Sequence, residues 1–108
     1  ELTQQQDRFD YIDTNKKVLI ELKSRRVNKN QYSTTIVPEK KYLCGVEKSS
    51  QGWRVIYVFN FIDCISYIEP DPNKNYVVRK QGRKDRGKLE YVNHINFNIT
   101  ELIDIQDN

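Results

Sequence analysis

The hydrophobic and polar positions near the start of the chain follow the two-residue period of β-strands. Residues 8–14 alternate, and residues 17–24 form a run of β-branched and other apolar residues. Asn15 and Lys16 stand between the two runs and predict a two-residue hairpin loop, because Asn tolerates the positive φ that such loops need. We therefore expect a β-hairpin here.

A helical pattern follows after a basic and then Ser/Thr-rich stretch for which no strand or helix is predicted. Pro38 is suited to the first turn of a helix, and Gly52 is suited to end it. The apolar stripe of this helix consists of Tyr42, Leu43 and Val46.

The second half of the chain reads as strands again. Residues 53–59 are too continuously apolar for an exposed edge, which favours a central strand. The other expected elements are strands over residues 61–68, 76–79 and 89–97, a turn at 71–73 and a basic loop over 80–88. The pattern predicts an α+β (α/β) fold with a central mixed β-sheet flanked by helices.

Length and composition restrict the class of protein. A chain of 108 residues accommodates one domain, residues 1–108, and its 37% hydrophobic content supplies a small core. No apolar run approaches the 18 residues of a membrane span, so we expect no membrane partner. The chain starts at Glu1 and has no Met, which leads us to expect a trimmed chain whose upstream part is missing.

The net charge of +3 conceals an uneven distribution of basic residues. Most of the 18 Lys and Arg residues fall within residues 16–29 and 74–88. Clustered positive charge favours a polyanionic partner such as nucleic acid, and solvated loops without a partner are the alternative.

Cysteine and histidine usage excludes a zinc site. Cys44 and Cys64 have no C-x-x-C spacing, and His94 is the single histidine. We interpret the cysteines as buried free thiols of a reducing, cytoplasmic compartment, and His94 as a hydrogen-bonded structural residue. Tyr32 is suited either to stack on a base or to pack in the core, and we favour the core.

The hairpin register brings candidate catalytic residues together. With Asn15 and Lys16 as the loop, the numbers of opposed residues sum to 31, so Asp10 opposes Glu21, and Lys23 points to the same side as Glu21. The same register pairs apolar residues on the other face, Phe9 with Leu22 and Tyr11 with Ile20.

Two opposed carboxylates repel each other, and a divalent cation offsets that repulsion. Mg²⁺ prefers oxygen ligands, which Asp10, Glu21 and the main-chain carbonyl of Leu22 would supply. The ammonium group of Lys23 would orient the nucleophile or stabilise charge on phosphorus. A surface hairpin with a solvated Glu–Lys pair is the structural alternative.

These residues resemble the core hairpin of the PD-(D/E)XK nuclease superfamily. Asp10 matches its metal-binding Asp, Glu21 its (D/E) and Lys23 its Lys, with a short spacer and with Phe9 in place of the Pro. The hydrophobic run before Glu21 and the order hairpin, helix, strand also fit.

The resemblance implies a restriction-endonuclease-like core and hydrolysis of phosphodiesters in duplex or branched DNA with Mg²⁺ or Mn²⁺. It also implies a homodimer, for which strands 53–59 and 61–68 could supply the surface, and a small resolvase-like, homing-type or phage enzyme. Some members carry another acid on a preceding helix, for which Glu1 is the candidate.

The resemblance implies a role for the basic stretches within residues 16–29 and 74–88: they would contact DNA phosphates. Lys40 or Lys41 could instead match a further Lys that some members place after the motif, although solvated helix lysines are the simpler interpretation. The candidate DNA-binding residues are Arg25, Arg26, Lys29, Lys40, Lys41, Lys80, Arg83, Lys84, Arg86 and Lys88.

Two other hypotheses compete with an endonuclease. One is a non-catalytic nucleic-acid-binding domain in which the hairpin is only scaffold. The other is an accessory domain of a larger nuclease or helicase. The discriminating feature is whether Asp10, Glu21 and Lys23 converge.

Overall fold

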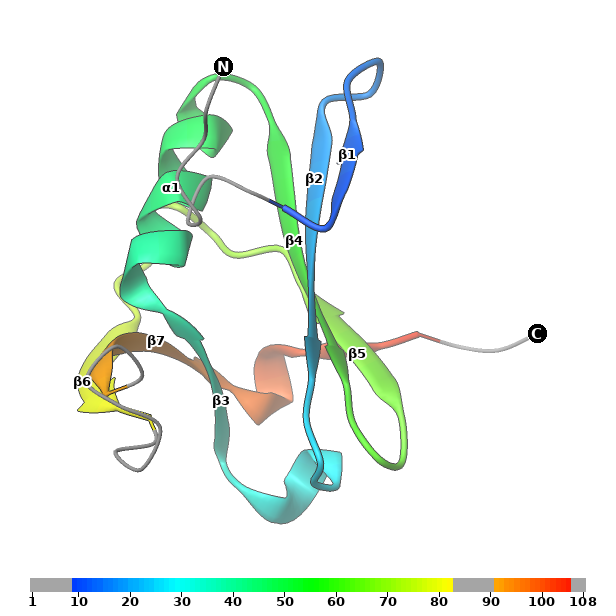
Figure 1. Ribbon diagram of the computed structural model, residues 1–108, viewed down its shortest axis with the longest axis vertical. Helices are drawn as coiled ribbons and strands as arrows, with labels where there is room; N and C mark the ends of the chain where they lie inside the picture. The colour runs from blue at the N-terminus through cyan, green and yellow to red at the C-terminus, as the bar shows by residue number, and fades with distance from the viewer. Residues whose placement is uncertain (1–8, 83–90, 106–108) are drawn as a thin grey trace.

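Eight strands and one α-helix form the regular structure of residues 9–82 and 91–105, the part of the chain that the computed structural model describes (Figure 1). Five strands form one mixed sheet. Their order across the sheet is β1 (Tyr11–Asp13), β2 (Val18–Ser24), β4 (Arg54–Asn60), β5 (Ile65–Ile68) and β8 (Ile103–Asp104).

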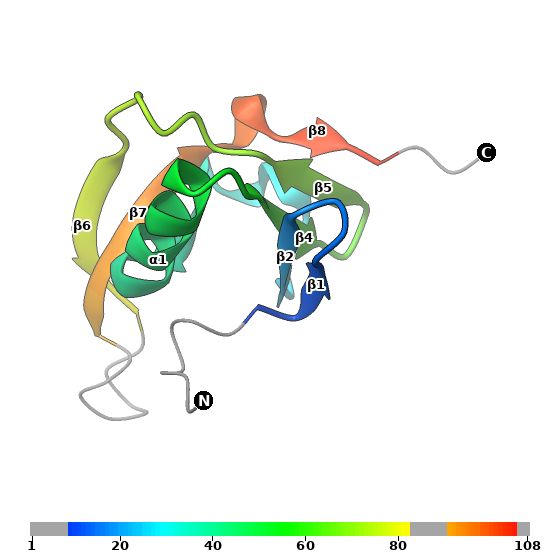
Figure 2. The same ribbon diagram turned by 90° about the horizontal axis from the view of Figure 1, so that it is seen from above.

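The remaining three strands form a separate antiparallel sheet. Their order is β3 (Thr34–Pro38), β7 (Val92–Asn98) and β6 (Val77–Gln81). Helix α1 (Glu39–Ser50) lies between the two sheets, in contact with β4 on one side and with β3 and β7 on the other (Figure 2). Short 3-10 turns occupy Lys29–Gln31 and Ile99–Glu101.

The predicted α+β class is confirmed, and so is the central position of the continuously apolar strand. β4 lies between β2 and β5, parallel to β2 and antiparallel to β5. The chain reaches β4 from β2 through β3 and α1, because parallel neighbours need a long crossover connection. Among the described residues a single helix and the second sheet cover the inner face of the five-stranded sheet, where the sequence suggested several helices.

The predicted hairpin register is confirmed, but its loop is longer. Tyr11 pairs with Ile20, and Asp13 with Val18 is the last pair before a turn of four residues. The positive φ of 55° belongs to Lys17 rather than to Asn15. The carboxylate of Asp13 accepts the Lys16 N–H at 3.1 Å and so replaces the main-chain bond of a tighter loop.

The side of the hairpin predicted to be apolar faces outward. Tyr11 and Leu22 are 54% and 52% exposed, whereas Leu19 and Glu21 are buried. The reason is that α1 packs against the opposite side of the sheet. Phe9 is buried because the chain bends at Asp10, before β1 begins, and leaves the plane of the hairpin.

Other predictions need local corrections. Tyr32 was expected in the core but is 60% exposed, and Leu43 of the predicted helix stripe is exposed as well. Cys44 and Cys64 are not joined in a disulfide, in line with the expected thiols, but they are only half-buried. Strand β3 was not predicted, residues 61–64 precede β5 without belonging to it, and Lys80 belongs to β6 instead of a loop.

Aromatic side chains make up the centre of the core. Tyr57, Phe59 and Phe97 are fully buried. The Phe97 ring meets Tyr57 at 5.8 Å and Tyr76 at 5.1 Å between centroids, so one side chain of β7 joins the two sheets. Close packing here holds β4, and with it β2, at a fixed distance from α1.

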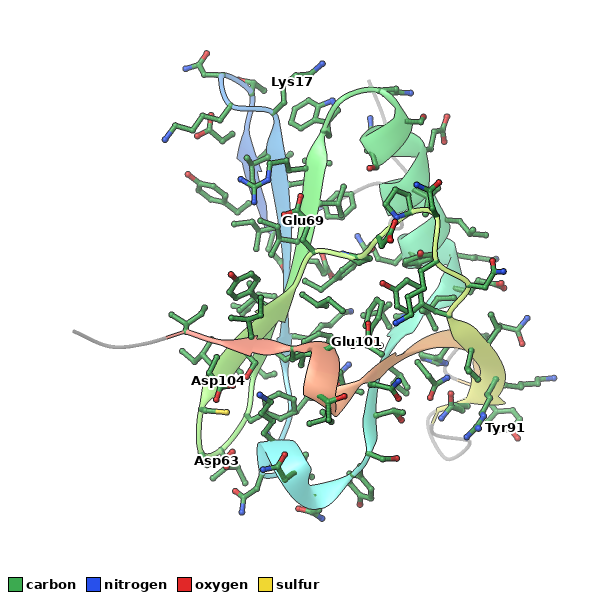
Figure 3. The ribbon with its side chains drawn as sticks, turned by 180° about the vertical axis from the view of Figure 1, so that it is seen from behind. Lys17, Asp63, Glu69, Tyr91, Glu101 and Asp104 are labelled. Atoms are coloured by element: carbon green, nitrogen blue, oxygen red, sulfur yellow. The ribbon has the colours of Figure 1, made fainter. Side chains whose placement is uncertain are left out.

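The C-terminal strand β8 is held to β5 by the side chain of Asp104. Its Oδ1 accepts hydrogen bonds from Lys29 Nζ at 2.6 Å and from Ser66 Oγ at 2.5 Å (Figure 3). The bond from Lys29, followed by that from Ser66, lowers the pKa of the Asp104 carboxyl group. A carboxyl group with a lowered pKa in the folded state stabilises the fold above its pKa in the unfolded chain.

We expect Asp104→Asn to lower the melting temperature at neutral pH, because the charge that pairs with Lys29 is removed. The difference from the unmodified protein should shrink as the pH falls below about 4 and through the lowered pKa of the folded state. Thermal melts at a series of pH values measure this. A difference that stayed constant down to about pH 2 would show that ionisation of Asp104 does not contribute.

Candidate active site

Glu21 lies in the middle of β2 and points toward α1. It is 8% exposed, which is unusual for a carboxylate. Its Oε2 lies 3.4 Å from Lys23 Nζ, and its Oε1 lies 3.5 Å from Lys41 Nζ. The structure therefore brings Glu21 and Lys23 together, as the sequence predicted, and adds a second ammonium group.

Lys41 is the part of this cluster that differs most from expectation. It was interpreted as a solvated helix lysine, but it is 7% exposed, in the first turn of α1. Its ammonium group lies 4.5 Å from the centre of the Phe9 ring, a cation–π distance. Pairing with Glu21 and contact with Phe9 explain how the charge is kept inside the fold.

Asp10 stands at the bend immediately before β1. Its Oδ2 accepts the main-chain N–H of Leu22 at 2.7 Å. This bond fixes the Asp10 carboxylate against the peptide that follows Glu21. Asp10 is exposed, and the contacts of the described residues join Glu21 to Lys23 and Lys41 but not to Asp10.

Carboxylate and carbonyl oxygens on this hairpin are ligands of the kind that a hard divalent cation prefers. Glu21 Oε1 is buried without a hydrogen-bond partner among the described residues, although a buried carboxylate normally accepts several. The Asp10 carboxylate, which accepts the N–H of Leu22, and the carbonyl of Leu22 offer further oxygens on the same hairpin. Within residues 9–82 and 91–105 no three His, Cys, Asp or Glu residues gather, so a cation here would keep several waters, as Mg²⁺ does.

Tyr57 is a buried polar neighbour of Glu21 that sequence reasoning missed. It lies beside Glu21 in the parallel register of β2 and β4, and its side chain is fully buried. Burial, and then the charge of Glu21, raise the pKa of the Tyr57 hydroxyl, which therefore stays protonated at neutral pH. Within an apolar run such as residues 53–59, no pattern distinguishes this tyrosine from a core aromatic.

Two of the candidate DNA-binding residues are engaged inside the fold. Arg25 is half-buried and donates to the carbonyl of Ile36 at 2.6 Å, and burial lowers its pKa. Lys29 pairs with Asp104. Both side chains connect strands, so their charges are not directed at solvent.

Other basic candidates lie on the surface. Arg26 and Lys40 are exposed, and so is Lys80, whose Nζ lies 5.6 Å from the Tyr91 ring centre. Lys80 pairs with Asn93 across β6 and β7, and the amide of Asn93 donates to Glu39, the residue before Lys40. The strand that carries Lys80 is thereby linked to the start of α1. Candidates outside the described residues are Glu1, Arg83, Lys84, Arg86 and Lys88.

His94 has the structural role expected of it. It is buried in β7, and its Nδ1 lies 2.8 Å from the carbonyl oxygen of Val92. Among the described residues no helix has the length and apolar character needed to cross a bilayer.

A mixed sheet whose first hairpin carries Asp10 and a Glu-x-Lys pair, beside a crossover helix, is the arrangement of a PD-(D/E)XK nuclease core. Comparison with family models agrees over nearly the whole chain. The chain belongs to the family described as "Phage putative PDDEXK endonuclease", whose model matches residues 2–105. Neither the curated proteins nor the solved structures contain a match to the chain.

Proposed function

We propose that this protein is a metal-dependent endonuclease that hydrolyses phosphodiester bonds in DNA. The observation that carries the proposal is the buried carboxylate of Glu21 between Lys23 and Lys41, on the hairpin that also bears Asp10. Burial of a carboxylate with an acceptor oxygen that receives no hydrogen bond is costly for a protein that only needs a scaffold. The family membership supports the same class of reaction.

In this proposal Asp10, Glu21 and the Leu22 carbonyl hold Mg²⁺ or Mn²⁺. When bound, the cation supplies an activated water and polarises a phosphoryl oxygen. Lys23, which is partly exposed beside Glu21, orients that water or stabilises the negative charge that builds on the phosphoryl oxygens. The geometry needs no further catalytic group from the described residues.

Lys41 has a different task, because it is less exposed than Lys23 and is fixed on α1. Its charge offsets that of Glu21 at 3.5 Å, and its contact with Phe9 holds it in place. We propose that Lys41 orients the Glu21 carboxylate and balances its charge, and thus corresponds to the further lysine that some members of the superfamily carry.

DNA would approach from the solvent side of Asp10. Exposed basic residues from α1 and β6, Lys40 and Lys80, lie on elements that meet at the start of α1. Such phosphate contacts are independent of base sequence and weaken with salt. Arg26, Arg83, Lys84, Arg86 and Lys88 stay in the proposed surface, whereas Arg25 and Lys29 are set aside because they serve the fold.

We also propose a homodimer in a reducing cytoplasm, of phage origin. The outer face of the five-stranded sheet carries a continuous apolar row, which fits a second copy of the chain because monomers rarely expose such rows. The row runs across four strands through Leu22, Val58, Tyr67 and Ile103. Two cysteines that are not joined in a disulfide agree with the compartment.

The experiment is cleavage of supercoiled plasmid and of a branched DNA with Mg²⁺, with Mn²⁺ and with chelator. Analytical ultracentrifugation of the same protein measures its mass and so tests the proposed homodimer. We expect cleavage with either cation and none with chelator. DNA binding without cleavage under every condition would reject the endonuclease and favour the non-catalytic binding domain.

A further inference from the structure

Two buried polar atoms on the neighbouring strands β2 and β4 have no hydrogen-bond partner among the described residues, although one of them is ion-paired with Lys41. They are Oε1 of Glu21 and the hydroxyl of Tyr57. Residues 21 and 57 are direct neighbours on the parallel strands β2 and β4, so their side chains leave the sheet on the same face, beneath α1. Buried polar atoms are nearly always hydrogen-bonded, so two such atoms on directly paired residues call for an explanation.

Helix α1 has a glycine where it passes the Tyr57 hydroxyl. Gly45 is the residue of α1 that faces it, and a Cβ at that position would lie 2.9 Å from the hydroxyl oxygen and 3.1 Å from Val55. Glycine in a helix interior is unfavourable relative to alanine. A phenylalanine at position 57 would fill the core without an unpaired hydroxyl, so packing alone does not explain the pair of Gly45 and Tyr57.

We infer that Tyr57 is a positioning residue for Glu21. Its hydroxyl donates to one water molecule, and that water donates to Glu21 Oε1, which orients the carboxylate while Lys23 and Lys41 balance its charge. Water-mediated bonds of this kind hold nearly as well as direct ones. Partners that orient a metal-binding carboxylate influence the affinity for the metal. The inference rests on the proposed function, since it assigns a task to Tyr57 only if Glu21 binds a cation.

The test is Mn²⁺ binding to the free protein, followed by electron paramagnetic resonance without DNA. We expect Tyr57→Phe to weaken Mn²⁺ binding about tenfold, the scale known for partners of metal ligands, while the melting temperature stays the same or rises. The Mg²⁺ concentration for half-maximal cleavage should rise by the same factor, with the KM for DNA unchanged.

Two further variants sharpen the test. Tyr32→Phe removes a hydroxyl from an exposed side chain outside both sheets and should leave Mn²⁺ binding unchanged. Gly45→Ala places a methyl group against the Tyr57 hydroxyl and should weaken Mn²⁺ binding while the helix is retained.

The outcomes separate the inference from the function on which it rests. Loss of Mn²⁺ binding in Glu21→Gln, with Tyr57→Phe indistinguishable from the unmodified protein, would overturn the role of Tyr57 alone. Unchanged Mn²⁺ binding in Glu21→Gln would overturn the metal site itself. A purely structural Tyr57 would change the melting temperature and leave the metal affinity untouched.

Discussion

Glu21→Gln should reduce DNA cleavage by about 1000-fold or more, because the variant loses the charged, buried ligand of the proposed cation. Glutamine has nearly the same shape, so the loss reflects charge and not volume. The rate of plasmid cleavage at saturating Mg²⁺ measures the effect. DNA affinity, followed by fluorescence anisotropy with Ca²⁺, should change little, since the proposed phosphate contacts lie elsewhere.

The same substitution should also destabilise the fold. Lys41 is buried, and in the variant its ammonium group no longer has the carboxylate at 3.5 Å. Breaking one side of a buried ion pair typically costs about 3 kcal/mol, of which the Phe9 ring offsets a part. Urea denaturation measures this loss, and circular dichroism shows that the variant is folded under the conditions of the cleavage assay.

Glu47→Gln is the matched control for this substitution. It makes the same chemical change at an exposed position of α1. It should alter the free energy of unfolding by less than about 0.5 kcal/mol and leave the rate of DNA cleavage unchanged. If Glu21→Gln cleaved DNA at the rate of this control, the hairpin would be scaffold and the catalytic assignment would fall.

The hairpin shows how far sequence reasoning reaches here. Its register was predictable because alternating residues on both sides of a short loop leave few pairings that match. The buried side was not predictable. Tyr11 and Leu22 make the outer side the more apolar one, yet α1 packs on the side of Leu19 and Glu21. A carboxylate thus takes the place of an apolar residue under the helix, against the rule that the apolar side is the inner one.

Lys41 and Tyr57 illustrate the limit of local patterns. A lysine in the first turn of a helix is ordinarily solvated, and only the position of β2 beneath α1 makes this one buried. Tyr57 belongs to an apolar run that correctly predicted a central strand, but its hydroxyl acquires meaning from Glu21 on a neighbouring strand. Both depend on contacts between residues distant in the chain, which periodicity does not encode.

Strand β3 was missed for a related reason. Its Ser/Thr-rich sequence and terminal proline resemble a loop, and Pro38 was correctly placed at the start of the helix. The segment becomes a strand because β7 supplies a partner along its whole length, from Thr34 to Pro38. Tertiary pairing overrides weak local propensity here.

Lys23→Met should lower the rate of DNA cleavage by about 100- to 1000-fold, the range known for the loss of one group that stabilises developing charge. Methionine keeps the length of the side chain and removes only the ammonium group. Stability should change little, because Lys23 is partly exposed and Glu21 retains Lys41 as its partner. Single-turnover cleavage at saturating protein separates this effect from any change in binding.

Lys16→Met provides the control, because it removes the same charge from an exposed position of the same hairpin. It should leave the single-turnover rate unchanged, so any effect of total charge on DNA association is subtracted. A rate for Lys23→Met within about threefold of this control would mean that Lys23 only neutralises Glu21. Lys41 also lies beside Glu21. The cleavage rate of Lys23→Met therefore decides between two alternatives: both lysines only neutralise Glu21, or Lys23 takes part in the reaction while Lys41 positions Glu21.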